Sequence, residues 1–277
     1  MTHDVPPSIP VFRVRATICG GTETGPVRTE NQDAIVVAGT VGFASGTRVN
    51  WSGEVPANGV LVAVIDGMGG HAGGADAAAL VATELARADL DRVGDDWNAW
   101  FSELSDRVSR AGGAWRTPDM GATAAILGLT SSGVTMANVG DCRIYRVVTG
   151  HLGQLSVDDR TDNPDSGLVT QAIGGSTRLD AHLWRQSLMG GSERYVLCSD
   201  GVWSTLDAAV LRELCSAERP ASDIVHGIER SIDARNADDN CSVVVVDLVA
   251  APEREPAAAS EAGPSEVFIR TQKEVAR

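Results

Sequence analysis

The segment VIDGMGGHAGG, residues 64–74, places one acid, Asp66, at the end of an apolar run and follows it with Gly67. The chain repeats this arrangement in YVLCSDGVW, residues 195–203, where Asp200 is also followed by a glycine. A carboxylate at the end of a buried strand is costly unless something neutralises it. Glycine in turn allows the backbone to approach a ligand closely. The two segments together predict a shared cation site.

Further acids stand beside Gly, Asn or another acid at predicted strand edges, namely Asp33, Asp141, Asp238 and Asp239. Hard divalent cations take oxygen ligands from carboxylates, backbone carbonyls and water. The sequence has no HExxH motif and no His-rich or Cys-rich spacing, which disfavours zinc. An all-oxygen site favours Mg²⁺ or Mn²⁺.

The composition excludes several function classes. A formal net charge of −14 argues against binding to a nucleic-acid backbone, which needs a basic face. The five cysteines form no CxxC pair, and with no signal peptide they indicate the reducing cytoplasm. No apolar stretch is long enough to cross a bilayer, so we expect no membrane partner. The acidity either serves solubility or gathers acids around a metal.

Hydrophobic patterning predicts strands and helices in separate blocks along the chain. Strands are expected at 11–18, 34–38, 61–66, 122–130, 134–140, 142–150, 180–188, 194–199 and 241–249. Helices are expected at 74–90, 95–111, 207–217 and 221–234. The strands within 122–150 look like consecutive antiparallel neighbours, and the turn-rich segment 40–59 looks like a hairpin or surface loop. This order favours the α+β class, with antiparallel sheets covered by helix pairs.

The chain is expected to hold one domain. Residues 1–10 contain three prolines and are predicted to be a flexible lead. Residues 11–249 form the domain, and residues 250–277 form an Ala/Glu/Pro-rich tail that is predicted to be disordered. Within that tail, the apolar patch VFIR, 267–270, is able to dock on the domain.

Seven motifs carry a resemblance to a known family. They are RTENQDA (28–34), VIDGMGGHAGG (64–74), GATAAIL (121–127), ANVGDCRIYR (137–146), TQAIGG (170–175), VLCSDGVW (196–203) and DDNCSVVVV (238–246). In this order and spacing, over about residues 13–249, they resemble the bacterial form of the type 2C metal-dependent protein serine/threonine phosphatases, the PPM family. The resemblance implies a four-layer α-β-β-α sandwich with a dinuclear Mn²⁺ or Mg²⁺ centre at one edge.

The matching motifs assign metal ligands by resemblance. Asp66 would bridge both ions, and Gly67 would ligate one through its carbonyl. Asp200 and Asp239 would hold the other ion, and Asp33 would ligate directly or through water.

The resemblance also assigns the remaining site residues. Arg28 matches the phosphate-binding arginine, and a guanidinium suits bidentate phosphate recognition. Asp141 matches the acid that helps to bind a weaker third ion. His71 is the candidate for protonating the leaving group, because histidine titrates near neutrality.

The implied reaction is direct hydrolysis of phosphoserine and phosphothreonine in proteins. A hydroxide that bridges the metals attacks phosphorus in line, and no phosphoenzyme forms. The expected partners are phosphorylated proteins and a cognate Ser/Thr kinase in cytoplasmic signal transduction, and we expect a monomer.

Several assignments have structural alternatives. Asp238 competes with Asp239, although the family's Asp-Asn pair favours the second acid. Asp33 can be an Asx-turn residue and Asp141 an ordinary hairpin acid. Arg28 can be a solvated surface arginine, and His71 can be a structural histidine near the site.

The sequence departs from the family pattern in three places. Gln32 replaces a common glutamate, and Met68 replaces the histidine of the eukaryotic form. The larger departure is the flap, since LSVDDR (155–160) reaches VTQAIGG (169–175) through only TDNPDSGL. This shortening predicts an open cleft, altered selectivity and a weak third metal site.

Two other functions compete with catalysis. One is a phosphatase-like binding module that regulates a partner, which the short flap and the segment 40–59 keep open. The other is a nucleotide-binding enzyme, which is disfavoured because the Gly-rich loop lacks the GK[ST] ending.

Overall fold

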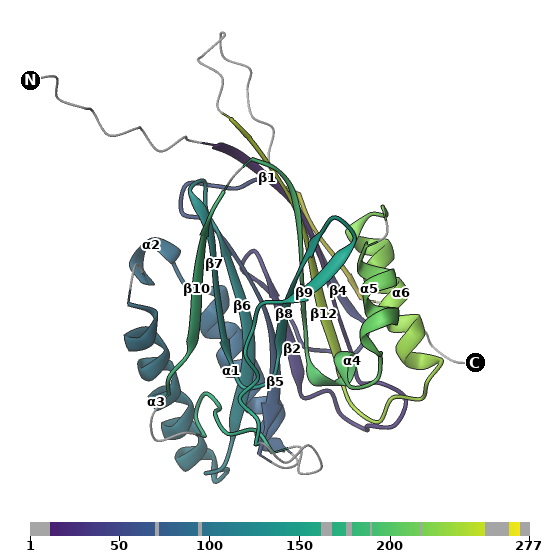
Figure 1. The fold of residues 1–277 in the computed structure, drawn as a ribbon. Helices are drawn as coiled ribbons and strands as arrows, with labels where there is room; N and C mark the ends of the chain where they lie inside the picture. The colour runs from purple at the N-terminus through teal and green to yellow at the C-terminus, as the bar shows by residue number, and fades with distance from the viewer. Residues whose placement is uncertain are drawn as a thin grey trace, which may run out of the picture.

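The computed structural model describes residues 12–69, 72–93, 96–161, 168–175, 179–188, 190–216, 218–252 and 266–271. Two antiparallel sheets pack face to face, and helices cover both outer faces (Figure 1). The predicted α+β class and the four-layer sandwich are therefore confirmed.

The first sheet has seven strands and joins the two ends of the described chain. Its spatial order is β13 (Glu266–Thr271), β4 (Thr47–Glu54), β1 (Phe12–Glu23), β12 (Cys241–Pro252), β11 (Gly191–Cys198), β8 (Arg143–Val148) and β9 (His151–Gln154). Strands β1 and β12 pair along twelve residues each, from Phe12 opposite Pro252 to Glu23 opposite Cys241.

The second sheet has six strands and carries the segment around Asp66. Its spatial order is β10 (His182–Ser187), β7 (Gly133–Val139), β6 (Gly121–Leu129), β5 (Val60–Met68), β2 (Asp33–Val37) and β3 (Thr40–Gly42). The apolar run of β5 is fully buried from Val60 to Ile65, because this strand lies inside the sheet and is covered on both faces.

Four longer helices complete the outer layers. Helices α1 (Ala72–Ala86) and α3 (Trp97–Trp115) cover the six-stranded sheet, whereas α5 (Ala208–Ser216) and α6 (Ala221–Asp233) cover the seven-stranded sheet (Figure 1). Two short helices, α2 (Leu90–Val93) and α4 (Asp200–Trp203), lie within connections. Among the described helices, none is both long and apolar enough to cross a membrane.

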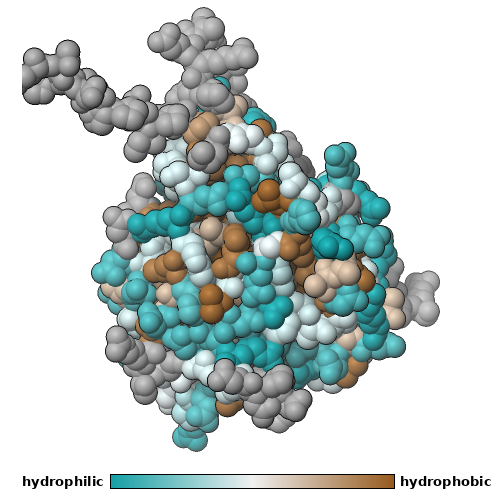
Figure 2. All heavy atoms as spheres, in the orientation of Figure 1, coloured by the Kyte–Doolittle hydropathy of each residue, from teal (hydrophilic) through white to brown (hydrophobic). Residues whose placement is uncertain are grey.

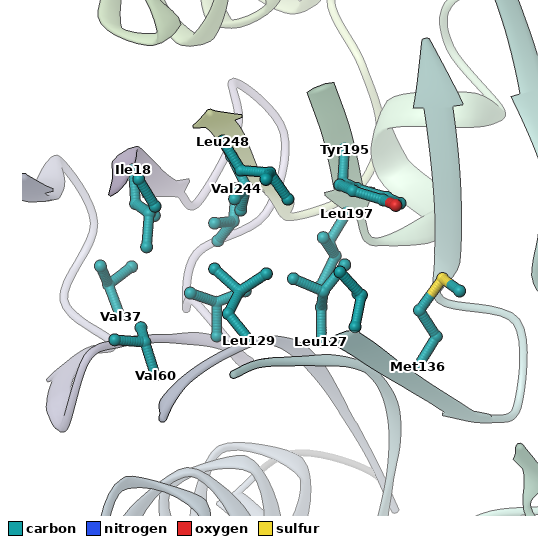
Figure 3. Packing of buried hydrophobic residues seen from close by; sticks show 14 of the residues in the cluster. Ile18, Val37, Val60, Leu127, Leu129, Met136, Tyr195, Leu197, Val244 and Leu248 are labelled. Atoms are coloured by element: carbon teal, nitrogen blue, oxygen red, sulfur yellow. The ribbon is translucent and has the colours of Figure 1, made fainter. Parts of the chain in front are cut away.

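The core between the sheets is built from aliphatic side chains of both inner faces. Figure 3 shows Ile18, Val244 and Leu197 of one sheet facing Val37 and Leu127 of the other. Each such side chain contributes about 1.5–3 kcal/mol when it is fully buried. On the face shown in Figure 2, hydrophobic residues are interspersed among hydrophilic ones.

Two sequence-based expectations about strand pairing require correction. Residues 40–59 do not form one hairpin, because β3 joins the six-stranded sheet and β4 joins the other. Within 122–150, β6 and β7 pair antiparallel as expected, but β8 leaves their sheet and pairs with β11 in the other one. The chain leaves the six-stranded sheet after β7 because it turns at Gly140, where a positive φ of 85° ends the strand and redirects the backbone.

The tail boundary also differs from the expectation. Strand β12 continues to Pro252 instead of ending at residue 249. Within the tail that was predicted to be disordered, β13 pairs with β4 and forms the edge of the seven-stranded sheet, and it includes the patch 267–270 that was expected to dock. The predicted flexible lead at 1–10 lies outside the described residues.

Candidate metal and phosphate site

Antiparallel pairing of β2 and β5 brings two of the predicted acids together. Asp33 at the start of β2 lies directly opposite Asp66 near the end of β5. Asp200 opens α4 at the end of β11, and its carboxyl group is hydrogen-bonded with that of Asp66. The acid–glycine segments at 64–74 and 195–203 therefore meet at one edge of the sandwich.

Burial makes this group of acids hard to ionise together. Loss of water raises the pKa of Asp66 well above its usual range, and the charges of Asp33, Asp200 and Asp141 raise it further. Burial likewise raises the pKa of Asp33 to about 7. The pKa of Asp200 is raised by burial first and by Asp239 second. A cation bound among these carboxylates would remove the penalty.

Hydroxyl groups hold Asp33 in place. The Ser199 hydroxyl donates to Asp33 Oδ2 at 2.7 Å, and the backbone N–H of Ser242 donates to the Ser199 hydroxyl at 3.0 Å. The Ser242 hydroxyl donates to the Thr22 hydroxyl at 2.7 Å. These side chains link β1, β2, β11 and β12 beneath the acids.

The glycines after the two acids are required by packing. A Cβ atom at Gly67 would collide with the carbonyl oxygen of Gly74, and one at Gly201 would collide with the carbonyl oxygen of Asn240. The Gly67 N–H also donates to the Gln32 carbonyl at 3.0 Å. Close backbone approach thus explains both glycines, and metal ligation by the Gly67 carbonyl stays a prediction.

Arg28 and Asp239 lie together, as the matching motifs suggested. Arg28 Nη2 donates to Asp239 Oδ2 at 2.9 Å, and Arg28 Nε donates to the backbone carbonyl of Asp238 at 3.0 Å. The Arg28 side chain remains 50% exposed. Asp239 therefore binds Arg28 through its carboxylate, whereas Asp238 binds it only through its backbone carbonyl.

Asn240 is a site residue that the sequence interpretation missed. Its side-chain oxygen accepts from the Gln32 N–H at 2.9 Å. Its Nδ2 donates to the carbonyls of Thr24 and Glu30, each at 2.9 Å. Asn240 thereby fastens the Arg28 loop to the Asp239 loop. The sequence does contain a signal for this role, since an amide directly after Asp239 can position the neighbouring acid.

Asp141 lies in the turn between β7 and β8 and is buried. Its carboxylate lies 3.5 Å from Arg160 Nη1, and its carbonyl accepts from Trp203 Nε1 at 3.0 Å. Burial raises the pKa of Asp141 to about 7, Asp200 adds to the rise, and Arg160 opposes it. His71 lies outside the described residues, so its predicted role has no structural account.

The donor set fits hard divalent cations in its chemistry. Asp33, Asp66, Asp200 and Asp239 supply carboxylate oxygens, and their mutual repulsion and burial raise the pKa of Asp33, Asp66 and Asp200. Within the described part of the chain, however, no three acidic, imidazole or thiol side chains are arranged to hold an ion as they stand. One cause is visible at Asp239, whose oxygens accept from Arg28 and from the Asn240 N–H.

In sequence and in fold the chain is similar to bacterial protein serine/threonine phosphatases of the type 2C kind, which confirms the predicted resemblance. No family model matches the chain. Protein phosphatase PhpP of Streptococcus pneumoniae is 24% identical over 250 residues, covering 82% of this chain and 95% of that protein. Serine/threonine protein phosphatase PstP of Mycobacterium tuberculosis is 29% identical, covering 73% of this chain and 43% of that protein.

Solved structures give the same result. PppA, described as a regulatory component of the type VI secretion system of Pseudomonas aeruginosa, aligns with a TM-score of 0.69 and 26% identity, covering 85% of this chain and 98% of that one. The catalytic domain of PstP, described in complex with two manganese ions, aligns with a TM-score of 0.65 and 25% identity, covering 85% and 99%.

Proposed function

We propose that the chain is a metal-dependent phosphatase that hydrolyses phosphoserine and phosphothreonine in proteins. The observation that carries this proposal is the convergence of Asp33, Asp66 and Asp200, with Arg28 and Asp239 at the same edge. Buried acids that repel one another have no evident structural use without a cation.

The proposed ligands are the residues named by the motifs. Asp66, Gly67, Asp200, Asp239 and Asp33 would hold two Mn²⁺ or Mg²⁺ ions, and the relative described with two manganese ions supports this count. When bound, such ions neutralise the carboxylates, act as Lewis acids and lower the pKa of water.

The chain's own residues bind and orient the substrate. Arg28 is half exposed and held at Nε by the Asp238 carbonyl, so its guanidinium can bind phosphoryl oxygens at the site edge. Engagement of Asp239 by a cation would release Arg28 Nη2 for this purpose. Ser199 orients Asp33, and Asn240 orients the Asp239 loop. His71 would donate a proton to the departing serine or threonine oxygen.

The short segment between Arg160 and Val169 supports an open cleft with altered substrate selectivity. Arg160 bridges directly to Val169, and the Thr161 N–H donates to the Leu168 carbonyl at 3.1 Å. The two ends of the short segment are therefore held side by side by antiparallel backbone pairing. In this proposal the enzyme acts as a cytoplasmic monomer, opposes a Ser/Thr kinase in signal transduction, and folds as one domain over 11–249.

Hydrolysis of p-nitrophenyl phosphate with Mn²⁺ tests the proposal. We expect Asp66→Asn and Asp200→Asn each to lower turnover by about 100-fold or more, equivalent to about 2.7 kcal/mol in the barrier. Asp106→Asn is the matched control, because Asp106 lies on the exposed face of α3. Wild-type turnover no higher than that of the two site variants would favour a regulatory binding module instead.

Phosphopeptides then test the substrate class. Peptides that carry phosphoserine, phosphothreonine or phosphotyrosine in one sequence context separate the proposed specificity from general phosphomonoesterase activity. Preference for phosphotyrosine would contradict the proposal.

A further inference from the structure

The backbone around Arg160 is fixed to the turn that carries Asp141. The Asp159 N–H donates to the Gly140 carbonyl at 2.9 Å, and the Gly140 N–H donates to Asp159 Oδ2 at 2.9 Å. On the other side, the Thr170 N–H donates to the Asp159 carbonyl at 2.8 Å. Arg160 follows directly and bridges to Val169. The short connection thus holds Arg160 beside Asp141 by its main chain.

The side chain of Arg160 is oriented by Trp203 as well as by Asp141. Its guanidinium carbon lies 5.1 Å from the centroid of the Trp203 ring, within the range of a cation–π contact. Trp203 also donates its Nε1–H to the Asp141 carbonyl at 3.0 Å. One indole therefore contacts both partners of the ion pair.

A second arginine on the same ring serves a different acid. The Arg143 guanidinium carbon lies 3.6 Å from the Trp203 centroid. Arg143 donates to both carboxylate oxygens of Asp158, at 3.1 Å from Nε to Oδ1 and 2.6 Å from Nη2 to Oδ2. Among the described residues, Arg160 is thus the cation paired with Asp141, whose side chain is only 3% exposed.

We propose that Arg160 supplies the positive charge at Asp141 that a third metal ion would otherwise supply. This inference rests on the proposed phosphatase function and says that the centre holds two ions, with a guanidinium in the third position. A divalent ion at Asp141 would have to displace Arg160 from both the carboxylate and the Trp203 ring. Unlike Arg28, which is half exposed, Arg160 is held at Asp141 by its main chain and by the Trp203 ring. The residues at Asp141 therefore do not fit a third ion, although the donor set beside them fits two.

Counting bound Mn²⁺ on the full chain tests this inference without measuring activity. Electron paramagnetic resonance of free Mn²⁺, with calorimetric titration, should give two ions per wild-type chain. Because Arg160 already compensates Asp141, Asp141→Asn should leave that count unchanged. Arg160→Gln should add a third, weaker site, and Arg160→Gln combined with Asp141→Asn should remove it again.

Two further variants serve as controls. Arg160→Lys retains the charge and should bind two ions. Arg87→Gln changes an exposed arginine after α1 and should also bind two. A third ion on the wild type that disappears in Asp141→Asn would overturn the inference and leave the proposed function intact. A folded Arg160→Gln variant that still binds two ions would overturn it equally. No Mn²⁺ bound to any variant would overturn both.

Discussion

Replacing Asn240 with alanine removes a side chain that joins two loops of the metal site. The change deletes three hydrogen bonds, from the Gln32 N–H and to the Thr24 and Glu30 carbonyls, each 2.9 Å long. At about 0.5–1.5 kcal/mol for each bond, the free energy of unfolding should fall by roughly 1.5–4.5 kcal/mol. For a domain of this size that corresponds to a fall in Tm of about 3–18 °C.

The same change should weaken metal binding. Groups that orient metal ligands typically contribute about 10–100-fold in metal affinity or activity, and Asn240 holds the Asp239 loop against the Arg28 loop. Urea denaturation in chelator measures the stability loss, and Mn²⁺ titration of hydrolysis measures the affinity. An effect on stability with unchanged Mn²⁺ affinity would refute the positioning role.

A matched control is available on α3. Asn98 is exposed, so Asn98→Ala should change the free energy of unfolding by less than about 0.5 kcal/mol. Its Mn²⁺ affinity should equal that of the wild type. Equal stability losses for the Asn240 and Asn98 variants would show that the three hydrogen bonds contribute nothing net.

Four further changes give independent expectations. Glu229 is buried and doubly hydrogen-bonded to Arg48, so Glu229→Ala should cost about 3–5 kcal/mol in urea denaturation. Glu84→Ala breaks an exposed pair with an arginine of α3 and should lower the free energy of unfolding by about 0–1 kcal/mol. Equal losses in the Glu229 and Glu84 variants would contradict the role of burial. Gly201→Ala drives a methyl group into a backbone carbonyl, so thermal melts should show a loss of about 1–3 kcal/mol, and a wild-type Tm would count against this packing. Mn²⁺ at 100 times its Kd should raise the unfolding free energy by about 2.7 kcal/mol in the wild type and far less in Asp66→Asn, and a chelator-insensitive wild-type Tm would argue against metal binding.

The sequence predicted the parts of the fold that local pattern determines. The apolar run before Asp66 became the interior strand β5, and the segment before Asp200 became β11. Both acids lie at the same edge because β5 and β11 belong to two stacked sheets and end on the same side of the sandwich. The motif order also predicted the neighbourhood of Arg28 and Asp239.

Features that depend on long-range pairing could not be predicted in this way. The segment 40–59 has the turn residues of a hairpin, but only tertiary packing decides that β3 and β4 join different sheets. The ion pair between Arg160 and Asp141 likewise depends on how the short connection folds back. The role of Asn240 was not predicted because an uncharged amide does not by itself indicate a metal or phosphate site.

The pairing of β1 with β12 sets the order in which the site can form during synthesis. Asp33 and Asp66 lie opposite each other on neighbouring strands, and both strands are synthesised in the first quarter of the chain. Strand β1 can pair early with β4, but its other edge stays open until β12 is made, and the first residue of β12 comes directly after Asn240. A chain interrupted before that strand would expose a long unpaired edge and hold half of an ion centre. Completion of the proposed binding centre is thus coupled to completion of the sheet, so an unfinished protein is expected to bind metal weakly.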